Sequence, residues 1–163
     1  MHGFTDADWE GSPTDRKSTS GGIFSIGSTT VSWYNRKQRS VVLSSAEAEY
    51  MAASQAACEA ILMRKILVNL FGSHLDPTVI HFDNQSCIKL SINPVFHDRS
   101  KHIDIHYHHI RDCVQRKIML LQYIPTEDPD AYILPKALTR SKFEYHRGRI
   151  RVKDNPYLVE REC

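Results

Sequence analysis

The sequence predicts one α/β domain, a mixed five-stranded sheet with helices on both of its faces. Its 163 residues suit a single domain. The first third of the chain contains three β-rich runs separated by turn residues, which predicts an antiparallel meander. The two later strands are separated by helical segments, which is typical of a mixed sheet covered by helices. We expect the domain to span residues 1–150 and residues 151–163 to form a loosely held C-terminal tail.

The strands of the meander are identified by alternating side chains and by the turns between them. Phe4, Asp6 and Asp8 alternate with small or apolar neighbours, so they share one side of the first strand. Gly27 opens a three-residue connection between the second and third runs, which predicts a hairpin. The three strands are expected at residues 3–9, 22–26 and 30–34.

A long helix is expected to follow the meander. Ser44 and Glu47 have the spacing of a capping box, and the apolar, alanine-rich run that follows continues to Leu70. Gly72 then supplies a C-terminal stop. The remaining elements are expected as a strand at 79–82, a short helix ending at Leu90, a helix at 101–113, a strand at 119–124, and a last helix that begins near Pro129.

Composition excludes several classes of protein. The N-terminus lacks the charged-then-apolar pattern of a signal peptide, and no apolar run approaches the roughly 20 residues of a membrane helix. We therefore expect an intracellular protein of the cytoplasm or nucleus with no membrane partner. The cysteines have no paired spacing, so we expect reduced thiols rather than disulfides or a zinc knuckle. They are Cys58, Cys87, Cys113 and Cys163.

Basic residues occur in clusters although the net charge is only +2. A balance this small does not by itself indicate a nucleic-acid partner, but clustered basic residues allow one. The clusters lie at residues 16–17, 36–39, 99–102 and 147–153.

Three acidic residues are expected where strand and helix ends can meet. Asp6 lies in the first strand, Glu49 in the first turns of the long helix, and Asp83 after the strand at 79–82. Carboxylates that cluster in this way repel one another unless they hold a cation. Carboxylate oxygens suit Mg²⁺ or Mn²⁺, and two such ions about 3.5–4 Å apart promote phosphodiester cleavage. The pattern indicates metal-dependent hydrolysis.

Six segments of the sequence, in this order, resemble the ribonuclease H region of copia-type retrotransposon polyproteins. The resemblance extends from about residue 3 to about residue 150. The segments are Thr5 to Trp9, Asp15 to Gly21, Ser32-Trp33 with Arg36 to Gln38, Leu43 to Tyr50, Asp83 to Ser86, and Asn93 to His97 continuing to Ile110-Arg111.

The resemblance implies a type 1 RNase H-like fold and an endonuclease that cuts the RNA strand of RNA/DNA hybrids with two Mg²⁺ or Mn²⁺ ions. It implies that Asp6, Glu49 and Asp83 are the catalytic metal ligands, with Glu49 bridging the ions. Two other acids lie nearby. Glu47 is about 200° from Glu49 around a helix and has a capping role, whereas Asp8 remains the alternative to Asp6.

Tyr132 stands where the family has a fourth aspartate. A neutral phenol is a poor Mg²⁺ ligand, and Pro135 and Ala137 also depart from the family pattern. Two interpretations stay open. Asp130 or Asp128 moves in as a substitute fourth ligand, or the second metal is held badly. In the second case the domain is a catalytically impaired module that acts through nucleic-acid or protein binding.

Short polar and basic side chains near the predicted acidic site are candidates for hybrid contacts, because RNA is distinguished from DNA through its 2′-OH. The alternative is that they serve as turn residues, caps and solvated charges. We expect a monomer whose partner is RNA/DNA hybrid, with other nucleic acid or a host protein as alternatives. The expected contact residues are Arg16, Lys17, Ser18, Thr19, Ser44, Ser45, Asn84, Gln85 and Lys101.

Two further patterns are expected to be structural. His102, His106 and His109 have helical spacing, which can indicate a zinc site, but no Cys or Glu completes the ligand set. Trp9 and Trp33 are expected in the core rather than at a base-stacking surface.

Overall fold

The computed structural model describes residues 1–9, 11–72, 75–85, 88–89, 101–125 and 130–153. Its centre is a five-stranded sheet in the order β3-β2-β1-β4-β5. The first three strands are antiparallel neighbours, whereas β4 runs parallel to β1 and β5 runs parallel to β4. This confirms the predicted mixed sheet with its antiparallel start. The strands are β1 His2–Asp8, β2 Thr19–Ile26, β3 Thr29–Lys37, β4 Thr78–Phe82 and β5 Met119–Tyr123.

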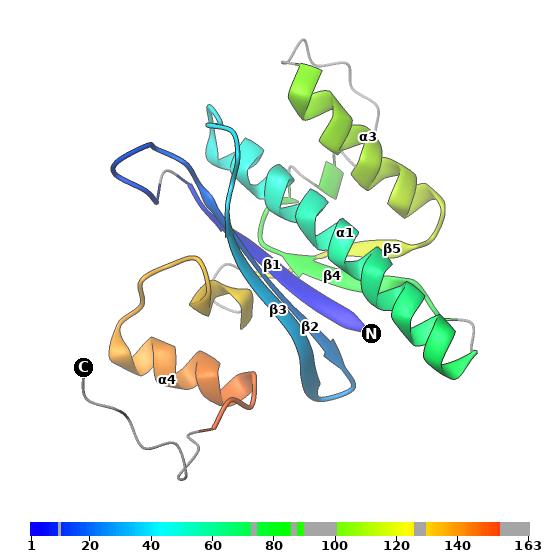
Figure 1. The fold of residues 1–163 in the computed structure, drawn as a ribbon. Helices are drawn as coiled ribbons and strands as arrows, with labels where there is room; N and C mark the ends of the chain where they lie inside the picture. Colours follow the sequence, from blue (N-terminus) through cyan, green and yellow to red (C-terminus); the bar gives the residue numbers. More distant parts are fainter. Residues whose placement is uncertain (10, 73–74, 86–87, 90–100, 126–129, 154–163) are drawn as a thin grey trace.

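Two helices cover one face of the sheet (Figure 1). Helix α1, Ser45–Phe71, lies across β1 and β2, and α3, Lys101–Gln115, packs against α1 and β5. The predicted ends of α1 are confirmed. The Ser44 side chain accepts from the backbone N–H of Glu47, and Gly72 adopts the left-handed conformation with its N–H bonded to Val68 O.

The other face carries the C-terminal elements (Figure 1). A 3-10 turn, η1 Asp130–Ile133, contacts β1 and β2, and α4, Arg140–Arg149, packs against η1. The expectation of one helix starting near Pro129 is therefore wrong. Pro135 lacks a backbone N–H and restricts the residue before it, so the chain forms only a short turn and α4 begins at Arg140.

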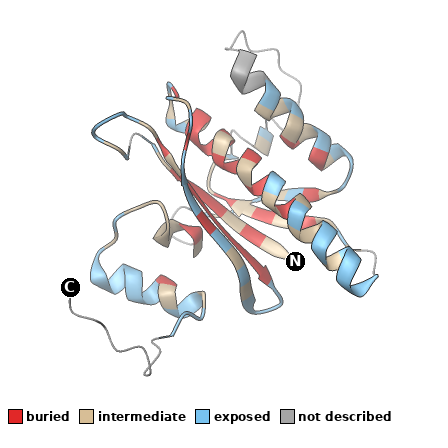
Figure 2. Cartoon of the chain, viewed as in Figure 1, coloured by how far each residue is buried: buried red, intermediate tan, exposed pale blue. Residues whose placement is uncertain are grey.

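The main core lies between the sheet and α1 (Figure 2). Phe24 and Phe82 are fully buried there. Alanines on the buried side of α1 allow a close approach of helix and sheet. They are Ala52, Ala53, Ala56, Ala57 and Ala60.

Both tryptophans depart from the expectation of burial. Trp33 is 67% exposed and Trp9 is 42% exposed. Trp33 lies on β3, which is an edge strand, and Trp9 follows the last residue of β1, so neither position is enclosed by neighbouring elements on all sides.

The short helix expected to end at Leu90 falls largely outside the described residues. Within the part of the chain that the structure describes, no helix combines the length and apolar character needed to cross a membrane.

Candidate active site

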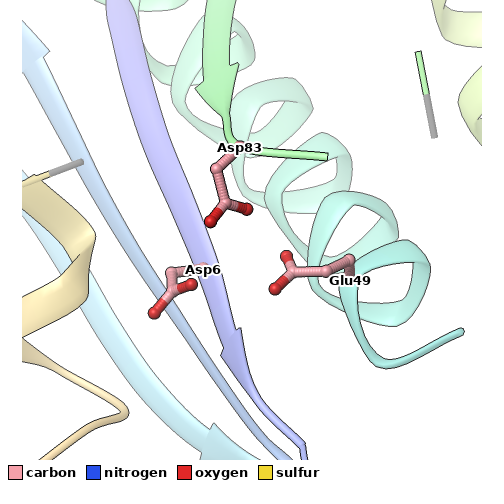
Figure 3. A group of neighbouring side chains, drawn as sticks. All are labelled: Asp6, Glu49 and Asp83. Atoms are coloured by element: carbon pink, nitrogen blue, oxygen red, sulfur yellow. The ribbon is translucent and has the colours of Figure 1, made fainter. Parts of the chain in front are cut away.

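Three carboxylates converge at one end of the sheet (Figure 3). Asp6 lies on β1, Asp83 directly follows β4, and Glu49 is in the first turns of α1. One carboxylate oxygen from each residue can be chosen so that all three lie within 4.8 Å of one another. The structure thus brings together the three acids that the sequence singled out.

Strand register explains why Asp6 and Asp83 meet. β1 and β4 are parallel neighbours in which His2 pairs with Val79 and Phe4 pairs with His81. Continuing this register by two residues places Asp83 beside Asp6, because side chains two apart lie on the same face of a strand.

Packing of α1 onto β1 positions Glu49. Ala7 is buried against Ala48 and Ala52, which holds the first turns of the helix close to the strand. The backbone N–H of Ala7 donates to Glu49 Oε1 over 3.3 Å. This bond fixes one oxygen of Glu49 and leaves Oε2 without a hydrogen-bond partner. The Glu49 carboxylate points toward the other two acids (Figure 3).

Asp6 and Glu49 are buried, whereas Asp83 is partly exposed. Asp6 is fully buried, and desolvation raises its pKa to about 6, although Lys136 opposes this shift. Desolvation also raises the pKa of Glu49 well above its ordinary value, with further contributions from the charges of Asp6 and Asp83. Asp6 Oδ2 and Glu49 Oε2 are buried and have no hydrogen-bond partner. Hard anionic oxygens that lack a donor fit a divalent cation such as Mg²⁺ or Mn²⁺.

Lys136 is a residue of this site that the sequence analysis missed. Its Nζ lies 2.9 Å from Asp6 Oδ1 and 4.4 Å from the ring centroid of Tyr132. Burial alone lowers the pKa of Lys136, but the Asp6 carboxylate more than reverses this, so the net shift is upward. The available signal was its position four residues after Tyr132, in the segment that the resemblance places at the site.

Asp130, the predicted substitute ligand, is directed toward α4 instead. Its Oδ1 lies 2.9 Å from Arg149 Nε and 3.8 Å from His146 Nδ1. Burial raises the pKa of Asp130, and Arg149 opposes the shift. The structure does not include Asp130 in the acidic cluster. Asp128, the other candidate, lies outside the described residues.

Glu47 and Asp8, the other two acids near the predicted site, make local contacts outside the cluster. Glu47 accepts through Oε2 from the Leu43 N–H over 2.7 Å, and its own N–H donates to Ser44 Oγ. The expected capping role of Glu47 is confirmed. Asp8 ends β1, and its carboxylate lies where a side chain at Gly11 would project, so it belongs to the turn after the strand.

The residues expected to contact nucleic acid differ in how far they are exposed. Ser18 is fully buried, so its position does not support a phosphate contact by its hydroxyl. The side chain of Lys101 lies outside the described residues. The others are at least partly exposed at the ends of strands or of α1: Arg16, Lys17, Thr19, Ser44, Ser45, Asn84 and Gln85.

A basic groove of about 520 Å³ lies between the end of β3, α1 and α3. Exposed Arg36, Lys37 and Arg39 line one wall, and Ser54 and His106 line the other. Gln38 at the base of this groove donates to Ser20 Oγ and to Ala48 O, each over 2.9 Å. Ala48 directly precedes Glu49, so Gln38 links this groove to the first turns of the helix that carries Glu49.

Solved structures similar to this chain include ribonuclease H domains. The N-terminal ribonuclease H domain of a Mycobacterium tuberculosis protein matches 91% of this chain and 97% of its own, with a TM-score of 0.58 and 10% identity. LC11-RNase H1, solved in complex with RNA/DNA hybrid, matches 77% of this chain and 86% of its own, with a TM-score of 0.54 and 11% identity. The fold is therefore that of ribonuclease H.

Sequence relatives are longer proteins. The Pol polyprotein of transposon TNT 1-94 from Nicotiana tabacum is 37% identical over 95% of this chain, and that of transposon RE1 from Arabidopsis thaliana is 38% identical over 96%. The chain spans only 12% and 11% of their lengths. No family model matches. The chain is a homologue of one segment of the Pol polyproteins of plant retrotransposons, and it has a ribonuclease H fold.

Proposed function

We propose that this domain is a metal-dependent endoribonuclease that cuts the RNA strand of RNA/DNA hybrids. One observation carries the proposal: Asp6, Glu49 and Asp83 converge from three elements, and two of their buried oxygens lack any donor. Leaving such oxygens ionised and unpaired is costly, so a bound cation would stabilise the ionised arrangement.

Asp6, Glu49 and Asp83 would hold Mg²⁺ or Mn²⁺ in this site. When bound, a divalent cation activates water and stabilises the leaving oxygen of a phosphodiester. The chain contributes a rigid arrangement of ligands. The register of β1 and β4 sets the spacing of the two aspartates, and the Ala7 N–H orients Glu49. Lys136 neutralises part of the negative charge on Asp6.

Hybrid is the proposed substrate because the domain also carries a basic groove. Arg36, Lys37 and Arg39 place positive charge along this groove between β3, α1 and α3, which suits the phosphates of a nucleic-acid strand. Ser44 and Ser45, which are at least partly exposed at the start of α1, would contact a sugar-phosphate backbone. Two comparisons support the same substrate: LC11-RNase H1 was solved with bound RNA/DNA hybrid, and the sequence relatives are retrotransposon polyproteins.

A second candidate is a hybrid-binding module that no longer cleaves. The observation that favours it is that no carboxylate stands at the fourth ligand position. Tyr132 offers a phenol in place of a carboxylate, and Asp130 is paired with Arg149. This module would keep the basic groove and the affinity for hybrid while losing the chemical step.

A cleavage assay distinguishes the two candidates. The RNA strand of a short hybrid is labelled, and product is measured with Mg²⁺ and with Mn²⁺ for the parent, for Asp83→Asn and for Tyr132→Asp. Cutting by the parent that is abolished in Asp83→Asn supports the endonuclease. Cutting gained only in Tyr132→Asp supports the binding module. Single-stranded RNA and duplex DNA serve as matched substrates, and equal cleavage of either would contradict the assignment to hybrid.

A further inference from the structure

Lys136 places a fixed positive charge inside the acidic cluster. Its ammonium lies 2.9 Å from Asp6 Oδ1, and its side chain is 24% exposed. The face of the Tyr132 ring is 4.4 Å from the same nitrogen, a distance at which an aromatic ring attracts a cation. The neutral phenol at the fourth position thus supports a lysine, where a carboxylate would support a metal ion.

Asp6 and Glu49 each have one carboxylate oxygen bonded within the protein and one oxygen without a hydrogen-bond partner. Asp6 uses Oδ1 for Lys136, and Glu49 uses Oε1 for the Ala7 N–H. What remains is one buried oxygen on each residue, Asp6 Oδ2 and Glu49 Oε2, both without a partner. Together with the Asp83 carboxylate these make a single set of ligands, enough to complete one hard cation but not two.

The balance of charges in the site also indicates one bound cation. Three ionised carboxylates carry three negative charges, and Lys136 cancels one of them. One divalent cation then neutralises the site. A second would leave an excess of positive charge in a buried place, which is strongly disfavoured.

Asp130, the candidate substitute for the fourth carboxylate, is paired with a residue of α4. Asp130 lies 2.9 Å from Arg149 Nε and also faces His146. Moving it to the cluster would break this ion pair between η1 and α4.

We propose that Lys136, held by Tyr132, takes the place of one of the two metal ions, so that this site binds a single divalent cation. The inference rests on the proposed metal site and specifies how many ions it holds. Tyr132 and Lys136 act as one unit: the ring positions the ammonium, and the ammonium occupies the side of Asp6 that a second ion would need.

Counting bound Mn²⁺ by electron paramagnetic resonance tests this directly. The proteins compared are the parent, Lys136→Met, the double variant Tyr132→Asp with Lys136→Met, and Lys65→Met. Lys65 is an exposed lysine of α1 and serves as the matched control. Circular dichroism verifies that each variant is folded, and the count on the parent does not depend on any variant.

We expect one ion per parent molecule and two per molecule of the double variant. Lys136→Met should still bind one ion, on the order of 10-fold more tightly, because a positive charge a few ångströms from the ion is removed. Lys65→Met should match the parent in both number and affinity.

Two ions on the parent, or one ion on a folded double variant, would overturn the inference while leaving the proposed metal site intact. No ion on the parent at millimolar Mn²⁺ would overturn the metal site itself, and the inference with it. The two failures are therefore distinguishable.

Discussion

Replacing Asp6 with Asn should stabilise the metal-free domain at neutral pH. Asp6 is fully buried, and its pKa of about 6 in the folded protein compares with an ordinary value of 3.8. Because the folded pKa is the higher one, the folded state holds the proton more tightly than the unfolded state. The contribution of Asp6 to stability is therefore complete below pH 3.8 and is lost as the pH rises through 6.

The magnitude follows from the same values. A rise in pKa from 3.8 to about 6 corresponds to about 3 kcal/mol, since one pKa unit is worth about 1.4 kcal/mol. We expect the free energy of unfolding of Asp6→Asn, relative to the parent, to be about 3 kcal/mol larger at pH 7.5 than at pH 4. In a domain of this size that amounts to roughly 6–12 °C in melting temperature.

The assay is urea unfolding of both proteins in the presence of a chelator across this pH range. Taking the difference between the proteins at each pH removes the titration of histidines and other groups that do not contact Asp6. Mn²⁺ should then reverse the order at pH 7.5, because only the parent keeps all three ligands. A stability difference that is the same at pH 4 and at pH 7.5 would refute the reasoning.

Three other substitutions test the framework around the site by urea unfolding. Ser44→Ala should cost about 1 kcal/mol through loss of the α1 cap, and Ser44→Asp should restore it; no change in the alanine variant would contradict the capping role. Gly21→Ala should cost about 1–3 kcal/mol, because the new Cβ would lie 2.7 Å from Pro135 Cδ; a neutral result would mean that η1 does not rest on β2. Asp130→Ala should weaken the docking of α4 through Arg149 and lower stability while leaving Mn²⁺ affinity unchanged; a loss of Mn²⁺ would show that Asp130 is a ligand after all.

Local patterns in the sequence were sufficient to predict most of the fold. Ser44 and Gly72 mark the ends of α1 because capping depends on a few adjacent residues. The hairpin between β2 and β3 follows from its turn, where Gly27 takes a positive φ of 58°. The antiparallel start and the mixed character of the sheet were likewise predicted from the order of the elements.

The convergence of Asp6, Glu49 and Asp83 was also predicted from sequence, because each acid lies at a recognisable end of an element. Lys136 was not predicted. Its contact with Asp6 joins residues 130 positions apart and depends on how the chain turns after η1. The pairing of Asp130 with Arg149 has the same origin, since it depends on where α4 begins. Pro135 ends η1 by a local rule, but the path that follows is set by packing.

Anomalous diffraction at the manganese edge, on crystals grown with Mn²⁺, tests the central claim most directly. The account predicts a peak enclosed by Asp6, Glu49 and Asp83, about 2 Å from an oxygen of each. Crystals of Asp83→Asn, soaked in the same way, should lose most of this peak. A parent crystal at millimolar Mn²⁺ with no peak among the three carboxylates would contradict the metal centre and the hydrolysis that we assign to it.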